Sequence, residues 1–181
     1  MLIKSPGLTE KLRGAYIFLD TNVFAIGSRS TELVELINEL HDEASCSFVS
    51  IASVLFEFTR GANSFTTYNE NVSFYQKIIE RIHPTSSFEN NPEFTVVMSK
   101  TNASNKSYTD FLLAAALYHY RDSGDTYLLT TDTRAFPSFF EMPYLITICE
   151  DKSGEIRNLG FIRFNENSYA KAAQSIIQQT N

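Results

Sequence analysis

The stretch Tyr-Ile-Phe-Leu-Asp-Thr-Asn, residues 16–22, decides the fold class. Its first four residues are apolar and favour strands, and the run ends at polar residues that are typical of turns and helix caps. An uninterrupted apolar run of this length indicates a strand buried on both faces, as in a parallel sheet. We therefore expect Asp20 to lie at the carboxyl end of a central strand.

Strand and helix patterns alternate along the rest of the chain. The predicted helices, with apolar residues at helical spacing, are 31–43, 50–60, 68–82, 108–122 and 165–178. The further predicted strands are 46–49, 126–130, 144–149 and 158–164. We expect 94–98 to be another strand or an irregular packed segment, and 134–140 to form a short helical turn. The alternation predicts an α/β fold with helices on both faces of a parallel sheet.

The C-terminal part has a different pattern. A turn signal at 151–154 lies between two strand patterns, which predicts an antiparallel hairpin within 145–164. In the terminal helix the residues expected to face inward are Tyr169, Ala172, Ala173, Ile176 and Ile177. A chain of 181 residues suits one domain. We expect a core over 1–149, with 150–181 packed on it as a hairpin strand and a helix.

Charge and hydropathy limit the function classes. The net charge is −6, and nucleic-acid binders are more often basic, so the composition argues mildly against such a partner. Clustered acids that hold a divalent cation would weaken this objection, because the ion supplies positive charge. No signal peptide and no apolar run near ~20 residues is visible, which predicts a cytoplasmic protein without a membrane segment.

Four acidic residues stand at positions that a metal site would use. Asp20 follows the first strand, and Asp132 comes two residues after the strand 126–130. Asp110 begins a helix that is apolar almost all round, and Glu57 flanks the apolar stripe of the helix 50–60. Ligands in such folds bind beyond the carboxyl ends of the strands, so we expect these acids to meet at one edge of the sheet.

An acidic cluster of this kind suits metal-assisted hydrolysis. Packed like charges repel unless a cation or protons compensate. Carboxylate oxygens suit Mg²⁺ or Mn²⁺. Such an ion can activate water and stabilise charge on a phosphodiester oxygen, with hydrolysis to a 5′-phosphate and a 3′-hydroxyl.

Each acid also has a purely structural interpretation. Asp20 and Asp132 can cap the turns or helices that follow them. Asp110 fits a capping box with Ser107. Glu57 can pair with Arg60, three residues further on. These alternatives remain open at the level of sequence, although four independent structural roles are less expected together than singly.

Four segments together resemble the PIN-domain family of ribonucleases, namely 17–24, 53–58, 108–116 and 128–136. The first resembles the family's opening strand with its first metal-binding Asp, here Asp20, and the second resembles the helix that carries its Glu, here Glu57. The third resembles the Asp that opens a buried, Ala-rich helix, here Asp110. The fourth resembles the last acidic motif, here Asp132, with a hydroxyl residue two positions earlier at Thr130.

The resemblance covers about residues 15–149 and implies a three-layer α/β/α sandwich with a central, mainly parallel sheet. It implies Mg²⁺- or Mn²⁺-dependent endonucleolytic cleavage of RNA, with Asp20, Asp110 and Asp132 as metal ligands and Glu57 as a further catalytic residue. Many small members, such as toxin nucleases of the VapC type, are homodimeric and inhibited by an antitoxin protein. This chain is longer, because 61–106 is extended and a hairpin and helix follow Leu145.

Two other hypotheses compete with this one. A phosphatase of the haloacid-dehalogenase type also begins with an Asp after its first strand, but it needs a second Asp where this chain has Asn22. A non-catalytic RNA-binding or protein-interaction module on the same fold is the stronger alternative. The candidates for phosphate contacts, each equally consistent with a solvated surface charge, are Arg29, Arg60, Lys100, Lys106 and Arg134.

Overall fold

The computed structural model describes residues 2–88, 90–101, 107–151 and 153–180. Its strands are β1 (Ile3–Lys4), β2 (Tyr16–Leu19), β3 (Ser47–Ile51), β4 (Arg81–His83), β5 (Thr126–Thr130), β6 (Phe140–Cys149) and β7 (Ile156–Phe164). Its α-helices are α1 (Leu8–Lys11), α2 (Thr21–Gly27), α3 (Thr31–Ala44), α4 (Ala52–Arg60), α5 (Phe65–Ile78), α6 (Pro92–Lys100), α7 (Tyr108–His119) and α8 (Glu166–Thr180). Short 3₁₀ turns are η1 (Thr85–Ser87) and η2 (Thr133–Ala135).

The described strands form one seven-stranded sheet in the order β1-β6-β7-β5-β2-β3-β4. β5, β2, β3 and β4 pair in parallel, whereas β1, β6 and β7 are joined by antiparallel pairings. The predicted α/β class is confirmed. The sheet is mixed rather than mainly parallel, because the C-terminal hairpin is built into it instead of being appended to it.

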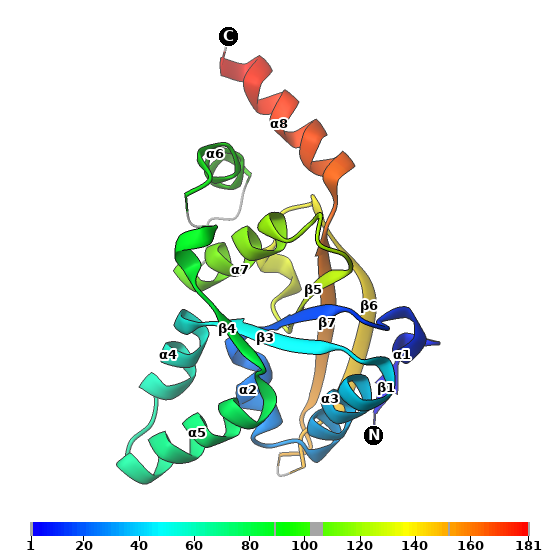
Figure 1. Cartoon of the computed structure of the whole chain (residues 1–181), viewed down its shortest axis with the longest axis vertical. Helices are drawn as coiled ribbons and strands as arrows, with labels where there is room; N and C mark the ends of the chain where they lie inside the picture. Colours follow the sequence, from blue (N-terminus) through cyan, green and yellow to red (C-terminus); the bar gives the residue numbers. More distant parts are fainter. Residues whose placement is uncertain (1, 89, 102–106, 152, 181) are drawn as a thin grey trace.

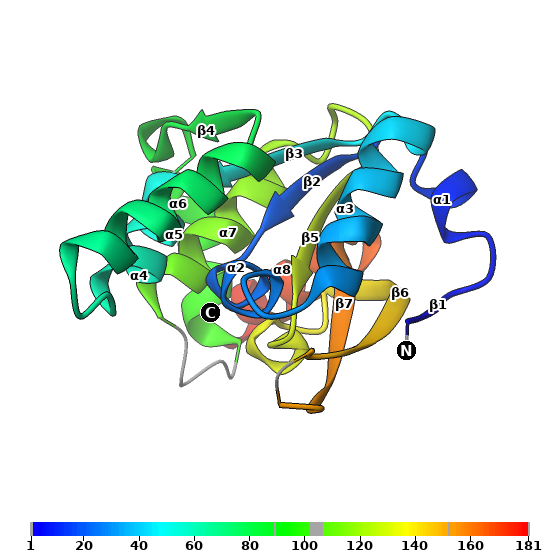
Figure 2. The same cartoon turned by 90° about the horizontal axis from the view of Figure 1, so that it is seen from below.

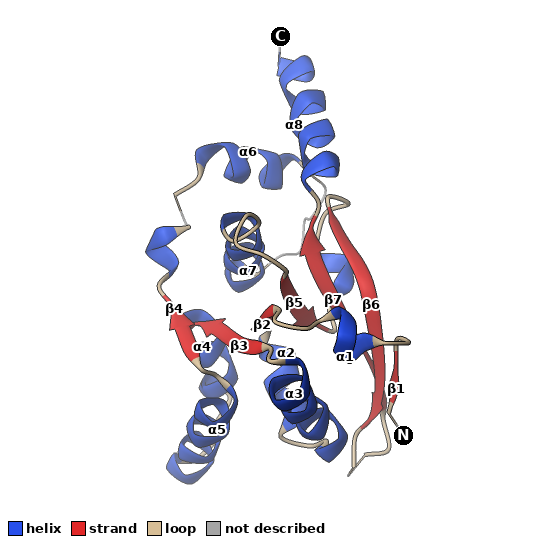
Figure 3. Cartoon of the chain, turned by 45° about the vertical axis from the view of Figure 1, so that its right-hand side comes forward, coloured by secondary structure: helices blue, strands red, loops and turns tan. Residues whose placement is uncertain are grey.

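β2 lies between β3 and β5 and is almost completely buried, as its apolar sequence predicts. The described helices lie around the sheet. α7 lies to one side of β2 and β3, and α2 and α3 lie to the other (Figures 1 and 3). α4 and α5 lie toward the β4 end of the sheet, and α1 lies toward the β1 end (Figure 2).

The predicted hairpin is confirmed, with β6 and β7 paired antiparallel from Phe140–Phe164 to Cys149–Ile156. β7 then pairs antiparallel with β5, so it lies inside the sheet between β5 and β6. The turn predicted at 151–154 includes Lys152, which lies outside the described residues. In the strand order, therefore, the C-terminal segment separates β6 from the parallel half of the sheet.

The prediction of a strand or irregular segment at 94–98 is wrong, because these residues belong to the helix α6. Asn91 caps this helix by accepting a hydrogen bond from the Phe94 amide, and Pro92 occupies its first turn. Phe94 is fully buried and stacks on Tyr118 of α7 at 4.7 Å between ring centroids. Packing thus outweighs the strand-favouring composition of the segment.

Three further differences concern short elements. Residues 21–27 form the helix α2, where the sequence suggested only a turn after Asp20. The helix predicted over 68–82 ends at Ile78 and is followed by the short edge strand β4. β1 and α1 were not predicted. Residues 102–106 of the extended segment 61–106 lie outside the described part of the chain.

The terminal helix extends from the end of β7 away from the sheet (Figure 1). Tyr169 in its first turn is buried against Tyr118 and Phe164, which anchors the start of α8. Ala172, Ala173 and Ile176 are half-buried against the core, as predicted. The side chain of Ile177 lies outside the described set. Within the described residues, none of the helices combines the length and apolar character needed to cross a membrane.

Candidate active site

Asp20 lies at the carboxyl end of β2 and is only 5% exposed. Its Oδ1 accepts a hydrogen bond of 2.6 Å from the Thr21 amide, so it also caps α2. Its Oδ2 accepts hydrogen bonds from the Thr130 hydroxyl, at 2.6 Å, and from the Asn22 side-chain amide. The structural interpretation of Asp20 as a cap is therefore correct, but the cap accounts for only one of its two oxygens.

Burial raises the pKa of Asp20 to about 6, and the negative charge of Asp110 contributes in the same direction. The hydrogen bonds from Thr130, Thr21 and Asn22 oppose this shift, because they favour the ionised form. Two of the predicted acids thus lie close enough to affect each other electrostatically. A nearby cation would relieve the cost of ionising Asp20.

The Thr130 hydroxyl connects Asp20 with the start of the loop that follows β5. It donates to Asp20 and accepts hydrogen bonds from the Asp132 backbone amide, at 3.0 Å, and from the Asn22 side-chain amide, at 3.2 Å. The Asn22 side-chain oxygen in turn accepts a hydrogen bond of 3.1 Å from the Thr131 amide. The ends of β2 and β5 are therefore joined by side chains beyond their backbone pairing.

Glu57 lies in α4 and connects two helix starts. Its carboxylate accepts hydrogen bonds of 3.0 Å from the Thr21 hydroxyl and 2.7 Å from the Thr109 hydroxyl. These threonines directly neighbour Asp20 and Asp110 in the chain. The described residues include no ion pair between Glu57 and Arg60, so the predicted structural alternative for Glu57 is wrong. Glu57 instead points toward the site that the sequence predicted.

Asp110 is half-buried at the start of α7 and forms the predicted capping box. Its Oδ2 accepts a hydrogen bond of 2.8 Å from the Ser107 amide, and the Ser107 hydroxyl accepts one of 3.1 Å from the Asp110 amide. Asp110 therefore caps α7, as predicted, and it also lies near Asp20, as predicted. One oxygen fixes the helix start, which leaves Oδ1 without a partner among the described residues.

Asp132 is exposed and lies just beyond β5. Its backbone amide is held by Thr130, but its side chain does not cap η2, so its predicted capping role is wrong. The structure therefore ties the backbone of Asp132, rather than its carboxylate, to Asp20. Within the described residues, no three His, Cys, Asp or Glu side chains gather closely enough to form a ready-made metal-binding group.

Three functional positions were missed from the sequence. Asn22 contacts both Asp20 and Thr130, and Thr21 and Thr109 position Glu57. The available signal was their place in the chain, because each lies within two residues of a predicted acid. Hydroxyl and amide residues at such positions usually indicate turns and caps, so they did not stand out.

The predicted phosphate contacts have unequal settings. Arg29 forms an ion pair of 3.2 Å with the buried Glu150 and so has a structural role. Arg60, Lys100 and Arg134 are exposed, and Arg134 lies two residues after Asp132. Lys106 lies outside the described residues. Arg134 is therefore the described cation closest in sequence to the candidate site.

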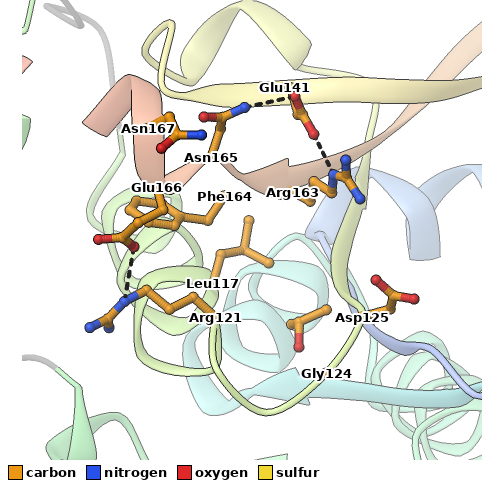
Figure 4. Close-up of a pocket in the computed structure, with 11 residues that line it drawn as sticks. Leu117, Arg121, Gly124, Asp125, Glu141, Arg163, Phe164, Asn165, Glu166 and Asn167 are labelled. Atoms are coloured by element: carbon orange, nitrogen blue, oxygen red, sulfur yellow. Dashed lines mark hydrogen bonds and ion pairs between the residues drawn. The ribbon is translucent and has the colours of Figure 1, made fainter. Parts of the chain in front are cut away.

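A polar pocket lies at the other end of β5, near Thr126 (Figure 4). Its charged side chains are largely compensated, because Arg121 pairs with Glu166 at 3.3 Å and Arg163 pairs with Glu141. The three residues between Thr126 and Thr130 separate this pocket from the acidic end of the strand. The pocket is thus distinct from the candidate active site.

The described contacts link Asp20 with the Asp132 backbone at the carboxyl ends of β2 and β5, and Glu57 with the starts of α2 and α7. Comparisons with protein-family models, with curated proteins and with solved structures give no match to this chain.

Proposed function

We propose that this chain is a metal-dependent endoribonuclease of the PIN type. The observation that carries the proposal is the hydrogen-bond network around Asp20, in which Thr130 links it to Asp132 and Thr21 connects it to Glu57. Asp20 is held buried and close enough to Asp110 to feel its charge, which is costly for stability unless a cation compensates. The proposal includes the three-layer α/β/α arrangement that the family resemblance implies.

The donor set fits Mg²⁺ or Mn²⁺, because carboxylate oxygens are the ligands that these ions prefer. Asp20, Asp110 and Asp132 would hold the ion. The elevated pKa of Asp20, about 6, supports this assignment, since burial and a neighbouring acid make its charge costly without a cation. The bound ion would supply an activated water and stabilisation of charge on the phosphodiester oxygen.

The side chains of the chain itself would orient this site. Thr130 and Asn22 fix the Asp20 carboxylate through its Oδ2, and the Ser107 amide fixes Asp110 through its Oδ2. Glu57 holds the starts of α2 and α7 at a fixed spacing through its two threonine donors. We therefore assign Glu57 a positioning role, and the three aspartates the role of ligands.

The test measures Mn²⁺-dependent cleavage of end-labelled single-stranded RNA by wild type, Asp20→Asn and Asp132→Asn. We expect each substitution to lower the rate more than about 100-fold, because it removes a ligand rather than an outer partner. Glu43→Gln, at an exposed position of α3, is the matched control. Circular dichroism checks that all variants fold. Unchanged cleavage by both folded aspartate variants would remove the proposed site.

We further propose that this nuclease acts in the cytoplasm as the toxin of a toxin–antitoxin pair and as a homodimer. The support is the family resemblance alone. Expression of the wild type is expected to arrest growth, and both aspartate substitutions are expected to relieve the arrest. A harmless wild type with active cleavage in vitro would contradict the toxin role alone. RNA binding without cleavage would favour the non-catalytic module.

A further inference from the structure

Two large aromatic side chains that neighbour candidate-site residues in the chain are exposed. Phe56 exposes 66% of its surface and Tyr108 exposes 64%. Phe56 directly precedes Glu57 in α4, and Tyr108 directly precedes Thr109 in α7. Glu57 and Thr109 share a hydrogen bond of 2.7 Å, which connects α4 with the start of α7. Each exposed ring is thus one residue away in the chain from this hydrogen bond.

The Tyr108 ring lies near other packed aromatic residues. It is nearly parallel to the Phe111 ring, with an interplanar angle of 18° and centroids 6.4 Å apart. Phe111 lies 6.2 Å from the fully buried Phe94. A ring that is already oriented by its neighbours loses less conformational entropy when a ligand stacks on it. Tyr108 therefore offers a preorganised flat surface at the start of α7.

The charge of the protein favours contacts with RNA bases over contacts with RNA phosphates. Binding through phosphates needs Lys and Arg, whereas this chain has a net charge of −6 and acids at the site. Stacking of a base on an aromatic ring does not depend on charge, and it tolerates any base. Bases in a duplex are already stacked on each other, so only unpaired bases can reach such rings.

We propose that Phe56 and Tyr108 form a base-stacking platform that binds unpaired bases of single-stranded RNA beside the carboxylates. This inference rests on the proposed function, since it names the form of RNA that the same site takes. It assigns substrate selection to two rings next to Glu57 and Thr109 in the chain, in addition to the acids. Binding should depend on the bases and should weaken only modestly with added salt.

The experiment measures fluorescence anisotropy of a labelled single-stranded RNA, of an abasic oligonucleotide of equal length and of a duplex. EDTA is present to prevent metal-dependent cleavage. Each of Phe56→Ala and Tyr108→Ala is expected to weaken binding of the single strand about tenfold, the usual effect of losing one stacked base contact. Binding of the abasic strand should stay unchanged. The wild type should prefer the single strand over the duplex.

Two further variants serve as controls. Ile3→Ala removes an exposed apolar side chain, 54% exposed, from β1 at the other end of the sheet and should bind RNA like the wild type. The double variant Phe56→Leu/Tyr108→Leu keeps apolar side chains in both helices but removes the aromatic rings. If the alanine variants do not fold, the loss of single-strand binding in this leucine variant tests the same platform.

Cleavage in Mn²⁺ separates this inference from the proposed function. The ring variants should raise KM about tenfold and leave kcat nearly unchanged, as expected for a group that binds substrate and transition state equally. If the wild type cleaves RNA and the leucine variant binds and cleaves like it, the platform is wrong and the nuclease stands. If the rings govern binding but the wild type cleaves no RNA, the nuclease is wrong and the platform stands. A wild type that binds no single-stranded RNA overturns the platform.

Discussion

Replacing Asp20 with Asn should change how the stability of the protein depends on pH. The pKa of Asp20 rises from 3.8 to about 6 on folding, because the carboxyl group is buried. The folded protein therefore binds this proton more tightly than the unfolded chain does. The stabilisation from Asp20 is fully present below about pH 4 and is lost as the pH rises through about 6.

The size of the effect follows from the difference between the two pKa values. A shift from 3.8 to about 6 corresponds to about 3 kcal/mol of unfolding free energy. Several other carboxylates, such as Glu39 and Glu141, have lowered pKa values and change stability in the opposite direction. The informative quantity is therefore the wild-type free energy of unfolding minus that of Asp20→Asn, in which those contributions cancel.

Urea unfolding in EDTA between about pH 4 and pH 8 measures this difference. We expect the wild type to lose about 3 kcal/mol relative to Asp20→Asn over this range. Glu43→Gln, which removes an exposed carboxylate, provides the comparison. Under the metal proposal, Mn²⁺ should restore wild-type stability near pH 8 and should not restore that of Asp20→Asn. A difference that stays constant with pH would refute the assigned environment of Asp20.

Two other substitutions test the network by urea unfolding. Thr130→Val removes the hydroxyl that donates to Asp20 and accepts from the Asp132 amide, and should lower the free energy of unfolding by about 2 kcal/mol near pH 8. Thr130→Ser should retain most of the stability. Equal losses in both variants would show that the hydroxyl is not the cause. Ser107→Ala should cost about 1 kcal/mol, because it removes the cap on the Asp110 amide; an unchanged midpoint would contradict that role.

The spacing of apolar residues in the sequence predicted most of the elements in the parallel half of the sheet. The strand at 126–130 was predicted with the bounds that the structure has, and the helix at 31–43 ends one residue later. These elements are buried in a regular way, so the spacing of apolar residues reveals them. Local composition misled at α6 and α2. There Phe94 and Phe24 pack into the core although the neighbouring residues favour strands or turns.

The candidate site was predictable as positions but not as contacts. That Asp20 and Asp132 follow neighbouring parallel strands could be inferred, because parallel strands end at the same edge. The partners of Glu57 could not be inferred, since they depend on how α4 packs against α2 and α7. Helical spacing alone favoured Arg60, the cation nearest to Glu57 in the sequence, as the partner of Glu57. Tertiary packing instead provided two threonine hydroxyls.

The place of β7 has a consequence for the order of folding. Thr130 pairs with Gly160, so one side of β5 is completed only by a strand that comes about thirty residues later in the chain. β1 depends on this step too, because it pairs with β6, which reaches the rest of the sheet through β7. Pairings between such distant segments form slowly, since the loops between them must close first. β2 pairs with β3 across a similar interval, Tyr16 with Ser47, but with β5 across a much longer one, Tyr16 with Thr126. The β5 end that carries Thr130 is therefore held on both sides only after this long-range pairing and the pairing with β7 have both formed.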